Sequence, residues 1–122
     1  MIDHVNVRRV LALPAGFPPI VVLCGSTRFV EDFNLWRKRL THEGQIVLSI
    51  EIVTTQQYEE DPQHVDRPNK EMLDELHKRK IDLADYVMVL NVGGYIGPST
   101  QSEIVYALAR NKKILYLEEA SA

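Results

Sequence analysis

The sequence predicts an α/β domain built on a parallel β-sheet of four strands, or of five if residues 5–13 add an edge strand. Four short apolar runs rich in β-branched residues are typical of buried parallel strands. They lie at residues 20–24, 46–50, 86–90 and 113–117. Segments with helical periodicity separate these runs. Strands that alternate with helices form a parallel sheet with right-handed crossovers and helices on both faces.

A change of period at Thr27 predicts the end of the first strand and the start of the first helix. Residues 20–24 (IVVLC) are an unbroken apolar run, as expected of a central strand. Four large apolar residues then recur every three or four positions, which places them on one helical face. They are Phe29, Phe33, Trp36 and Leu40. Gly44 is a typical helix stop, and residues 46–50 (IVLSI) predict the second strand.

Residues 53–68 are polar and lack a clear period, so we expect a loop that can cover a ligand site. The second helix is predicted over residues 69–83. Its expected inward residues are Met72, Leu76 and Leu83. Opposite charges four residues apart, Asp74–Lys78 and Glu75–Arg79, are expected on the solvent side. Residues 99–110 predict the third helix.

This order of elements predicts a flavodoxin-like or Rossmann-like three-layer sandwich with strand order 2-1-3-4. Ligands bind such sheets beyond the carboxyl ends of the strands, chiefly where the strand order reverses. The segments that follow the first three strands therefore converge at one rim. They begin at Gly25, Glu51 and Asn91. Asp82 and Asp85 fall at the opposite rim, which argues against a catalytic role for them.

A single domain accounts for the 122 residues, with residues 1–19 as an N-terminal extension and residues 20–122 as the folded unit. The net charge of -3 argues against binding to a nucleic acid polymer. No apolar run approaches the roughly 18 residues that a membrane span requires. One cysteine and no signal-peptide pattern lead us to expect a cytoplasmic protein.

The segment Gly25–Arg28 (GSTR) places small residues at a strand-to-helix turn. Backbone N–H groups and the helix dipole attract an anion such as phosphate to such a turn, and Arg28 adds a positive charge. In the alternative interpretation, Ser26 or Thr27 only caps the helix and Arg28 is solvated. The spacing leaves both open, because it matches neither GxGxxG nor GxxxxGK[ST].

The segment Asn91–Leu108 joins a glycine-rich turn to a helix that carries Glu103 near its start. Glu103 either points into the rim or closes a capping box by bonding back to the Thr100 backbone. Ser99 and Thr100 are likewise either cap residues or phosphate ligands. Two residues of the turn are also candidates: Tyr95 either stacks on a base or covers the turn, and Gly97 shapes the turn.

Three further residues carry polar or reactive groups. Glu51 is either a second rim carboxylate or a solvated loop acid. His77 either contacts a sugar, as donor of a proton or hydrogen bond, or packs at a polar boundary. Cys24 is expected to be an inert packing residue. The four histidines are scattered and no paired Cys/His spacing exists, so we predict no metal site.

Three segments together resemble the nucleoside 2-deoxyribosyltransferase superfamily, and more closely its 2'-deoxynucleoside 5'-phosphate N-hydrolase branch. They are VVLCGSTR (21–28), LADYVMVLN (83–91) and STQSEIVYALARNKKILYL (99–117). The resemblance covers residues 20–117. It implies cleavage of the N-glycosidic bond of a nucleoside 5'-monophosphate without a metal or organic cofactor. It also implies a homodimer or a larger homo-oligomer.

The resemblance further implies roles for single residues. Glu103 falls on the family's nucleophile, which forms a glycosyl-enzyme intermediate that water resolves. Glu51 falls on a family acid. The residues that match phosphate-binding positions are Gly25, Ser26, Arg28 and Ser99. At two positions the chain departs from the family: Gly97 replaces an acid of the transferases, which argues against a free-nucleoside transferase, and His77 replaces a sugar-contacting aspartate.

Two alternatives to an enzyme are compatible with the same residues. A non-catalytic nucleotide-binding or sensor module would use the same turns without cleaving a bond. In a purely structural adaptor, Glu103 would serve only as a helix cap.

Overall fold

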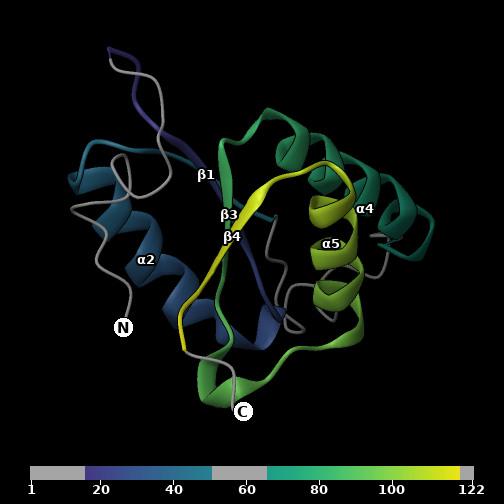
Figure 1. Ribbon diagram of the computed structural model, residues 1–122. Helices are drawn as coiled ribbons and strands as arrows, with labels where there is room; N and C mark the ends of the chain where they lie inside the picture. The colour runs from purple at the N-terminus through teal and green to yellow at the C-terminus, as the bar shows by residue number, and fades with distance from the viewer. Residues whose placement is uncertain (1–15, 51–65, 119–122) are drawn as a thin grey trace.

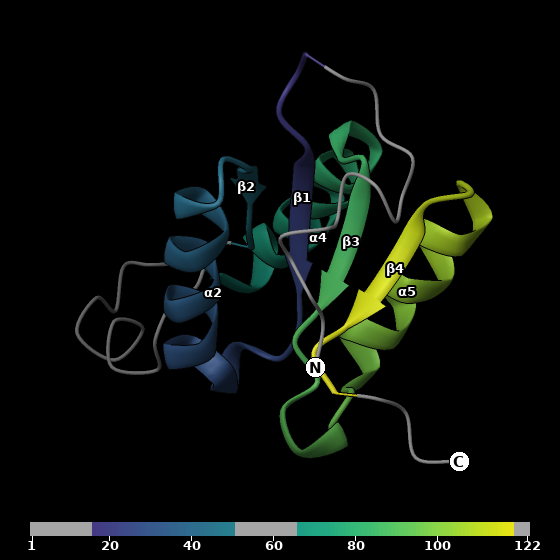
Figure 2. The same ribbon diagram turned by 60° about the vertical axis from the view of Figure 1, so that its left-hand side comes forward.

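The computed structural model describes residues 16–50 and 66–118 and shows a parallel β-sheet between two layers of helices (Figure 1). The strands are β1 (Ile20–Cys24), β2 (Ile46–Leu48), β3 (Tyr86–Val89) and β4 (Lys113–Tyr116). They pair in parallel in the order β2-β1-β3-β4, which can be followed in Figure 2. The predicted fold class and strand order are confirmed. Glu51 and the edge strand predicted at residues 5–13 lie outside the described residues.

Helix α2 covers one face of the sheet, and helices α4 and α5 cover the other (Figure 1). Their bounds are α2 Val30–His42, α4 Asp66–Leu83 and α5 Pro98–Ala109. Helix α4 begins at Asp66, so the loop predicted for residues 66–68 is wrong. Pro68 fits within the first helical turn because N–H groups there have no intrahelical acceptor. No helix in the described ranges is long and apolar enough to cross a membrane.

Successive residues of β1 face opposite helical layers. Val21 and Leu23 pack in a buried cluster with residues of α2, whereas Val22 and Cys24 pack with residues of α4 and α5. The α2 residues of the first cluster are Phe33, Trp36 and Leu40, with Phe29 packed at its edge. The apolar face predicted for the first helix is therefore confirmed.

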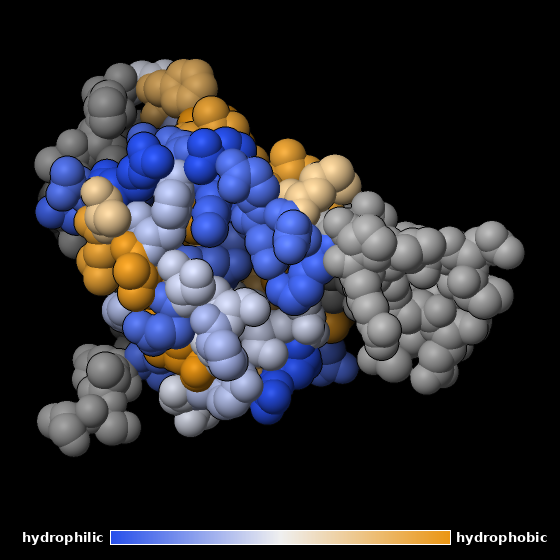
Figure 3. All heavy atoms as spheres, turned by 90° about the vertical axis from the view of Figure 1, so that its right-hand side faces the viewer, coloured by the Kyte–Doolittle hydropathy of each residue, from blue (hydrophilic) through white to orange (hydrophobic). Residues whose placement is uncertain are grey.

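The face that α4 turns to the sheet differs from the predicted one. Met72, Leu76 and Leu83 are exposed, whereas His77 and Ile81 are buried. Both sets have helical spacing, so periodicity does not separate them. The buried set includes His77 because its ring finds polar partners inside the fold. On the face formed by α4 and α5, the exposed apolar side chains lie among hydrophilic ones (Figure 3).

The inward face of α4 can be tested with a matched pair of substitutions. Ile81 is 0% exposed and Leu83 is 68% exposed. We expect Ile81→Ala to lower the free energy of unfolding by about 2–5 kcal/mol, because it removes packed methyl groups and leaves a cavity. Leu83→Ala is expected to change it by less than about 0.5 kcal/mol. Urea unfolding followed by circular dichroism measures both, and equal losses would contradict this assignment.

Candidate functional site

A cavity of about 540 Å³ lies between α4, α5 and the turn that follows β1. This volume falls within the roughly 300–1,000 Å³ typical of small-molecule sites. Nine of the residues predicted for the site line it: Gly25, Ser26, Thr27, His77, Tyr95, Gly97, Ser99, Thr100 and Glu103. The rim at which ligands were expected therefore carries a cavity of suitable size.

Helix α4 contributes more of the lining than the sequence indicated. Its additional lining residues are Lys70, Leu73, Asp74, Leu76 and Lys80. The polar ones among them recur with His77 every three or four positions, at residues 70, 74, 77 and 80, so a polar helical stripe was the available signal. Lys70 Nζ donates to Asp74 Oδ2 at 3.0 Å, and Lys80 Nζ donates to the Ser49 carbonyl at 2.6 Å. Of the two charge pairs predicted for this helix, Glu75–Arg79 is present at 3.5 Å.

The turn after β1, Gly25–Thr27, packs closely at its first position, so a side chain there would require its neighbours to shift by a few tenths of an ångström. A Cβ on Gly25 would lie 3.2 Å from the Leu90 carbonyl oxygen and 3.3 Å from the Phe33 ring. Ser26 caps the following turn, because its Oγ accepts a hydrogen bond from the Arg28 N–H at 3.3 Å. The capping role considered for Ser26 is thus present, on a residue that also lines the cavity.

Helix α5 begins without a side-chain cap. Gly97 is its N-cap residue and Pro98 occupies the first helical position. The capping interpretation for Ser99, Thr100 and Glu103 is therefore wrong, because these residues lie inside the helix. The uncapped first turn of α5, Pro98–Thr100, lines the cavity, and N–H groups at such a helix start are suited to binding an anion.

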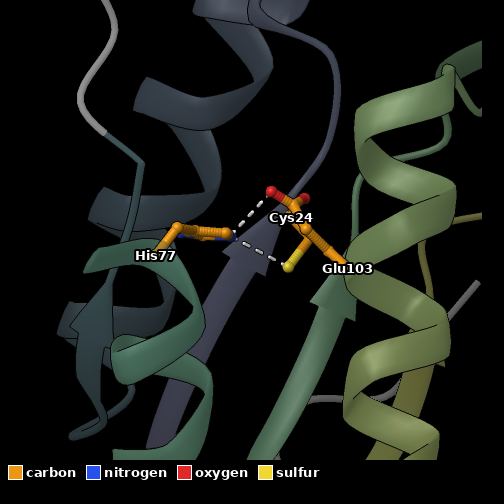
Figure 4. Close-up of side chains that lie close together, drawn as sticks. All are labelled: Cys24, His77 and Glu103. Carbon is orange, nitrogen blue, oxygen red and sulfur yellow. Dashed lines mark hydrogen bonds and ion pairs between the residues drawn. The ribbon is translucent and has the colours of Figure 1, made fainter. Parts of the chain in front are cut away.

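Three side chains from separate elements meet at the cavity: Cys24 from β1, His77 from α4 and Glu103 from α5 (Figure 4). We refer to them as the Cys-His-Glu cluster. His77 Nε2 lies 3.4 Å from Glu103 Oε2 and 3.3 Å from Cys24 Sγ. The side chains of His77 and Glu103 are only 4% and 14% exposed, and Cys24 is fully buried. Cys24 therefore contacts two titratable groups, a role that its place in an apolar strand did not indicate.

Burial controls the protonation of the cluster. It raises the pKa of Glu103 to about 7, and the negative charge of Asp74 acts in the same direction. It lowers the pKa of His77 to about 4, with a further contribution from the positive charge of Lys80. It also raises the pKa of Cys24, as does the nearby Glu103. Near neutral pH, His77 is uncharged, Cys24 is a thiol and Glu103 is partly ionised.

The contact between His77 and Glu103 is consequently a hydrogen bond rather than a salt bridge at neutral pH. A proton on either Nε2 or Oε2 satisfies it. Two buried atoms, His77 Nδ1 and Glu103 Oε1, have no hydrogen-bond partner among the described residues. Within the described part of the chain, these two atoms of the cluster are therefore available for further hydrogen bonds.

Arg28 and Tyr95 meet at the edge of the cavity. The Arg28 guanidinium carbon lies 4.0 Å from the centre of the Tyr95 ring, and Nη2 donates to Tyr95 Oη at 3.2 Å. Tyr95 lines the cavity, whereas Arg28 lies behind it and is exposed. Arg28 thus brings a positive charge to the rim without itself forming part of the wall.

Asn91, which begins the third segment expected at the ligand rim and is a candidate substrate-binding residue, forms hydrogen bonds to the backbone of Glu118. Its Nδ2 donates to the Glu118 carbonyl at 3.0 Å, and its Oδ1 accepts from the Glu118 N–H at 2.9 Å. These bonds tie the end of β3 to the end of β4, and Asn91 does not line the cavity. Asp85 accepts a hydrogen bond from the Ile20 N–H at 2.7 Å, which places it at the opposite rim as expected.

Comparison with protein-family models finds no match for this chain, and comparison with curated proteins finds none either. The fold and the site define the protein by class. It is an α/β protein with a small-molecule-sized cavity beside its parallel sheet and a buried Cys-His-Glu cluster at that cavity.

Proposed function

We propose that the protein is a nucleotide N-glycosidase, which cleaves the N-glycosidic bond of a nucleoside 5'-monophosphate. The observation that carries the proposal is the position of Glu103. Its carboxyl group lines the cavity and faces His77 instead of the helix backbone. A carboxylate held in a cavity beside two potential phosphate-binding turns is the arrangement that such a reaction requires.

We assign phosphate binding to two turns, Gly25–Thr27 and Pro98–Thr100. Both line the cavity and both lie at the amino-terminal end of helical structure, where N–H groups and the helix dipole favour an anion. Arg28 adds a positive charge at the rim. Glu103 follows Thr100 by about one helical turn on α5, roughly 4.5 Å along the axis, so it is within reach of a sugar next to the phosphate.

In the proposed reaction, an ionised Glu103 oxygen bonds to the anomeric carbon of the sugar while the bond from that carbon to the base nitrogen breaks. The bonding electrons leave with the base, which takes up a proton. Water then cleaves the glycosyl-Glu103 ester and releases the sugar phosphate with retained configuration. Solvent water supplies the proton that the base takes up, and the water molecule that cleaves the ester returns a proton to solvent.

His77 is assigned to positioning Glu103. Because His77 is neutral at pH 7, it can donate one hydrogen bond to an ionised Glu103 without neutralising the charge through ion pairing. A hydrogen bond of this kind selects one orientation of the carboxylate and leaves the nucleophilic oxygen charged.

Base release from a panel of nucleotides tests this proposal. The protein is incubated with ribo- and deoxyribonucleoside 5'-monophosphates, and with the matching nucleosides, in buffer containing a metal chelator. Chromatography is expected to detect free base from at least one monophosphate. The matching nucleoside is expected to react at least about 10-fold more slowly, because it lacks the charge-assisted hydrogen bonds of the phosphate.

Two other outcomes would count against an enzyme. Calorimetric binding of a nucleotide without any product after long incubation would instead establish a nucleotide-binding or sensor module. Neither binding nor base release from any member of the panel would eliminate both functions.

A further inference from the structure

We propose that Cys24, His77 and Glu103 form a three-ligand site for a thiophilic divalent metal ion, best matched by Zn²⁺. The Sγ, imidazole nitrogen and carboxylate oxygen atoms that these residues offer lie within 4.8 Å of one another. In a tetrahedral zinc site with bonds of about 2.0–2.3 Å, neighbouring ligand atoms are roughly 3.3–3.6 Å apart. The distances from His77 Nε2 to Cys24 Sγ and Glu103 Oε2 are 3.3 and 3.4 Å.

The three donor types identify the class of metal. Thiolate and imidazole ligands favour Zn²⁺ and similar transition metals, whereas Mg²⁺ and Ca²⁺ prefer sites made of oxygen atoms. One thiolate and one carboxylate would balance the two positive charges of the ion. An uncharged assembly suits this location, because Cys24 is fully buried and a net charge there would lack solvation.

The surroundings of the cluster leave room for a fourth ligand. His77 and Glu103 line the cavity, whereas Cys24 does not, so an ion bound between the three would lie next to the open space. Three protein ligands with one open position are typical of zinc sites that accept water or a small molecule. The buried Glu103 Oε1, which has no partner in the described part of the chain, offers a further oxygen to the ion or to its water.

The hydrogen bonding of His77 limits the affinity for a metal ion. His77 Nδ1 has no hydrogen-bond partner among the described residues, whereas metal-binding histidines usually donate this N–H to an acceptor. We therefore expect weaker binding than in a structural zinc site. Bound metal would occupy Glu103, so it would also inhibit the base release proposed above.

Cobalt titration tests the site directly. Untagged protein is treated with chelator, freed of it and titrated with Co²⁺, and the near-ultraviolet band from cobalt–thiolate charge transfer is recorded. The chain has one cysteine, so any such band reports Cys24. We expect a 1:1 complex, loss of the band in Cys24→Ser, and an affinity at least about 10-fold lower in His77→Gln and Glu103→Gln. Zn²⁺ should displace Co²⁺ and bleach the band.

Matched controls separate this site from adventitious binding. His42 and Glu75 are exposed, so His42→Gln and Glu75→Gln are expected to bind Co²⁺ like the unmodified chain. The proposal is overturned if no thiolate band forms, or if calorimetric Zn²⁺ affinity is the same in Cys24→Ser as in the unmodified chain. If Cys24→Ser fails to fold, the Co²⁺ affinities of His77→Gln and His42→Gln are compared instead. Equal affinities would overturn the proposal. Base release in chelator is measured independently, so either proposal can fail alone.

Discussion

Glu103→Gln is expected to lower the rate of base release from a nucleoside 5'-monophosphate by about 10³-fold or more. Glutamine has nearly the same shape as glutamate but carries no negative charge, so it cannot form the glycosyl ester through an anionic oxygen. Because the substitution preserves the volume of the side chain, the cavity and the proposed phosphate-binding turns should remain. Single-turnover assays with chromatographic detection of free base measure the effect.

Two controls make this result specific. Glu75→Gln removes an exposed carboxylate from α4 and is expected to leave the rate unchanged. Nucleotide affinity measured by calorimetry should differ by no more than a few-fold between Glu103→Gln and the unmodified protein. A Glu103→Gln protein that releases base at the unmodified rate would remove Glu103 from the mechanism. The proposed reaction of the unmodified protein is also expected to gain kcat/KM as pH rises through about 7, where Glu103 ionises.

Substitutions of His77 and Glu103 are expected to reveal opposite pH dependences of stability. The pKa of Glu103 is raised from 4.5 to about 7, so its contribution to stability is complete below pH 4.5 and is lost as pH rises through about 7. The pKa of His77 is lowered from 6.5 to about 4, so its contribution is complete above pH 6.5 and is lost as pH falls through about 4. The two effects largely cancel in the unmodified chain.

Each single variant leaves one of these effects uncompensated. Relative to a variant that lacks both groups, Glu103→Gln should become more stable as pH rises from about 4 to 6.5, because it retains the lowered pKa of His77. His77→Gln should become less stable as pH rises from 4.5 to about 7, because burial still raises the pKa of Glu103. The full shift of either group corresponds to an upper limit of roughly 3 kcal/mol.

Urea unfolding at constant ionic strength between pH 4 and 8 measures how the free energy of unfolding of each variant changes with pH. The double variant His77→Gln/Glu103→Gln serves as the reference, because it retains neither group while keeping side chains of similar length. If, relative to this reference, the free energies of unfolding of the two single variants change with pH in the same direction, the opposite pKa shifts expected from burial of His77 and Glu103 are contradicted.

The fold was largely predictable because local periodicity and burial agree along most of the chain. The run at Ile20–Cys24 became β1 with the expected bounds, and the apolar stripe of the first helix became the buried face of α2. A strand buried on both faces must be apolar at every position, and a helix on one face must be apolar at every third or fourth. Both requirements are visible without any knowledge of tertiary contacts.

Two local predictions were wrong because the sequence around each was equally consistent with a second pattern. The inward face of α4 was assigned to Met72, Leu76 and Leu83, although His77 and Ile81 are the buried residues. Helix periodicity allows either face, and the sheet selects the one whose histidine reaches polar partners. The Thr100–Glu103 spacing matched a capping box, but Gly97 and Pro98 start the helix earlier and move Glu103 beyond its first turn.

The sequence alone determined the parallel sheet, its strand order and the rim at which a site would form, since these follow from local patterns and general rules of topology. Only the tertiary structure decided that Cys24, His77 and Glu103 come together. They belong to a strand and two helices that are distant along the chain, so no spacing connects them. Burial between these elements gives the three groups their shifted pKa values, and with them the chemistry proposed for the cavity.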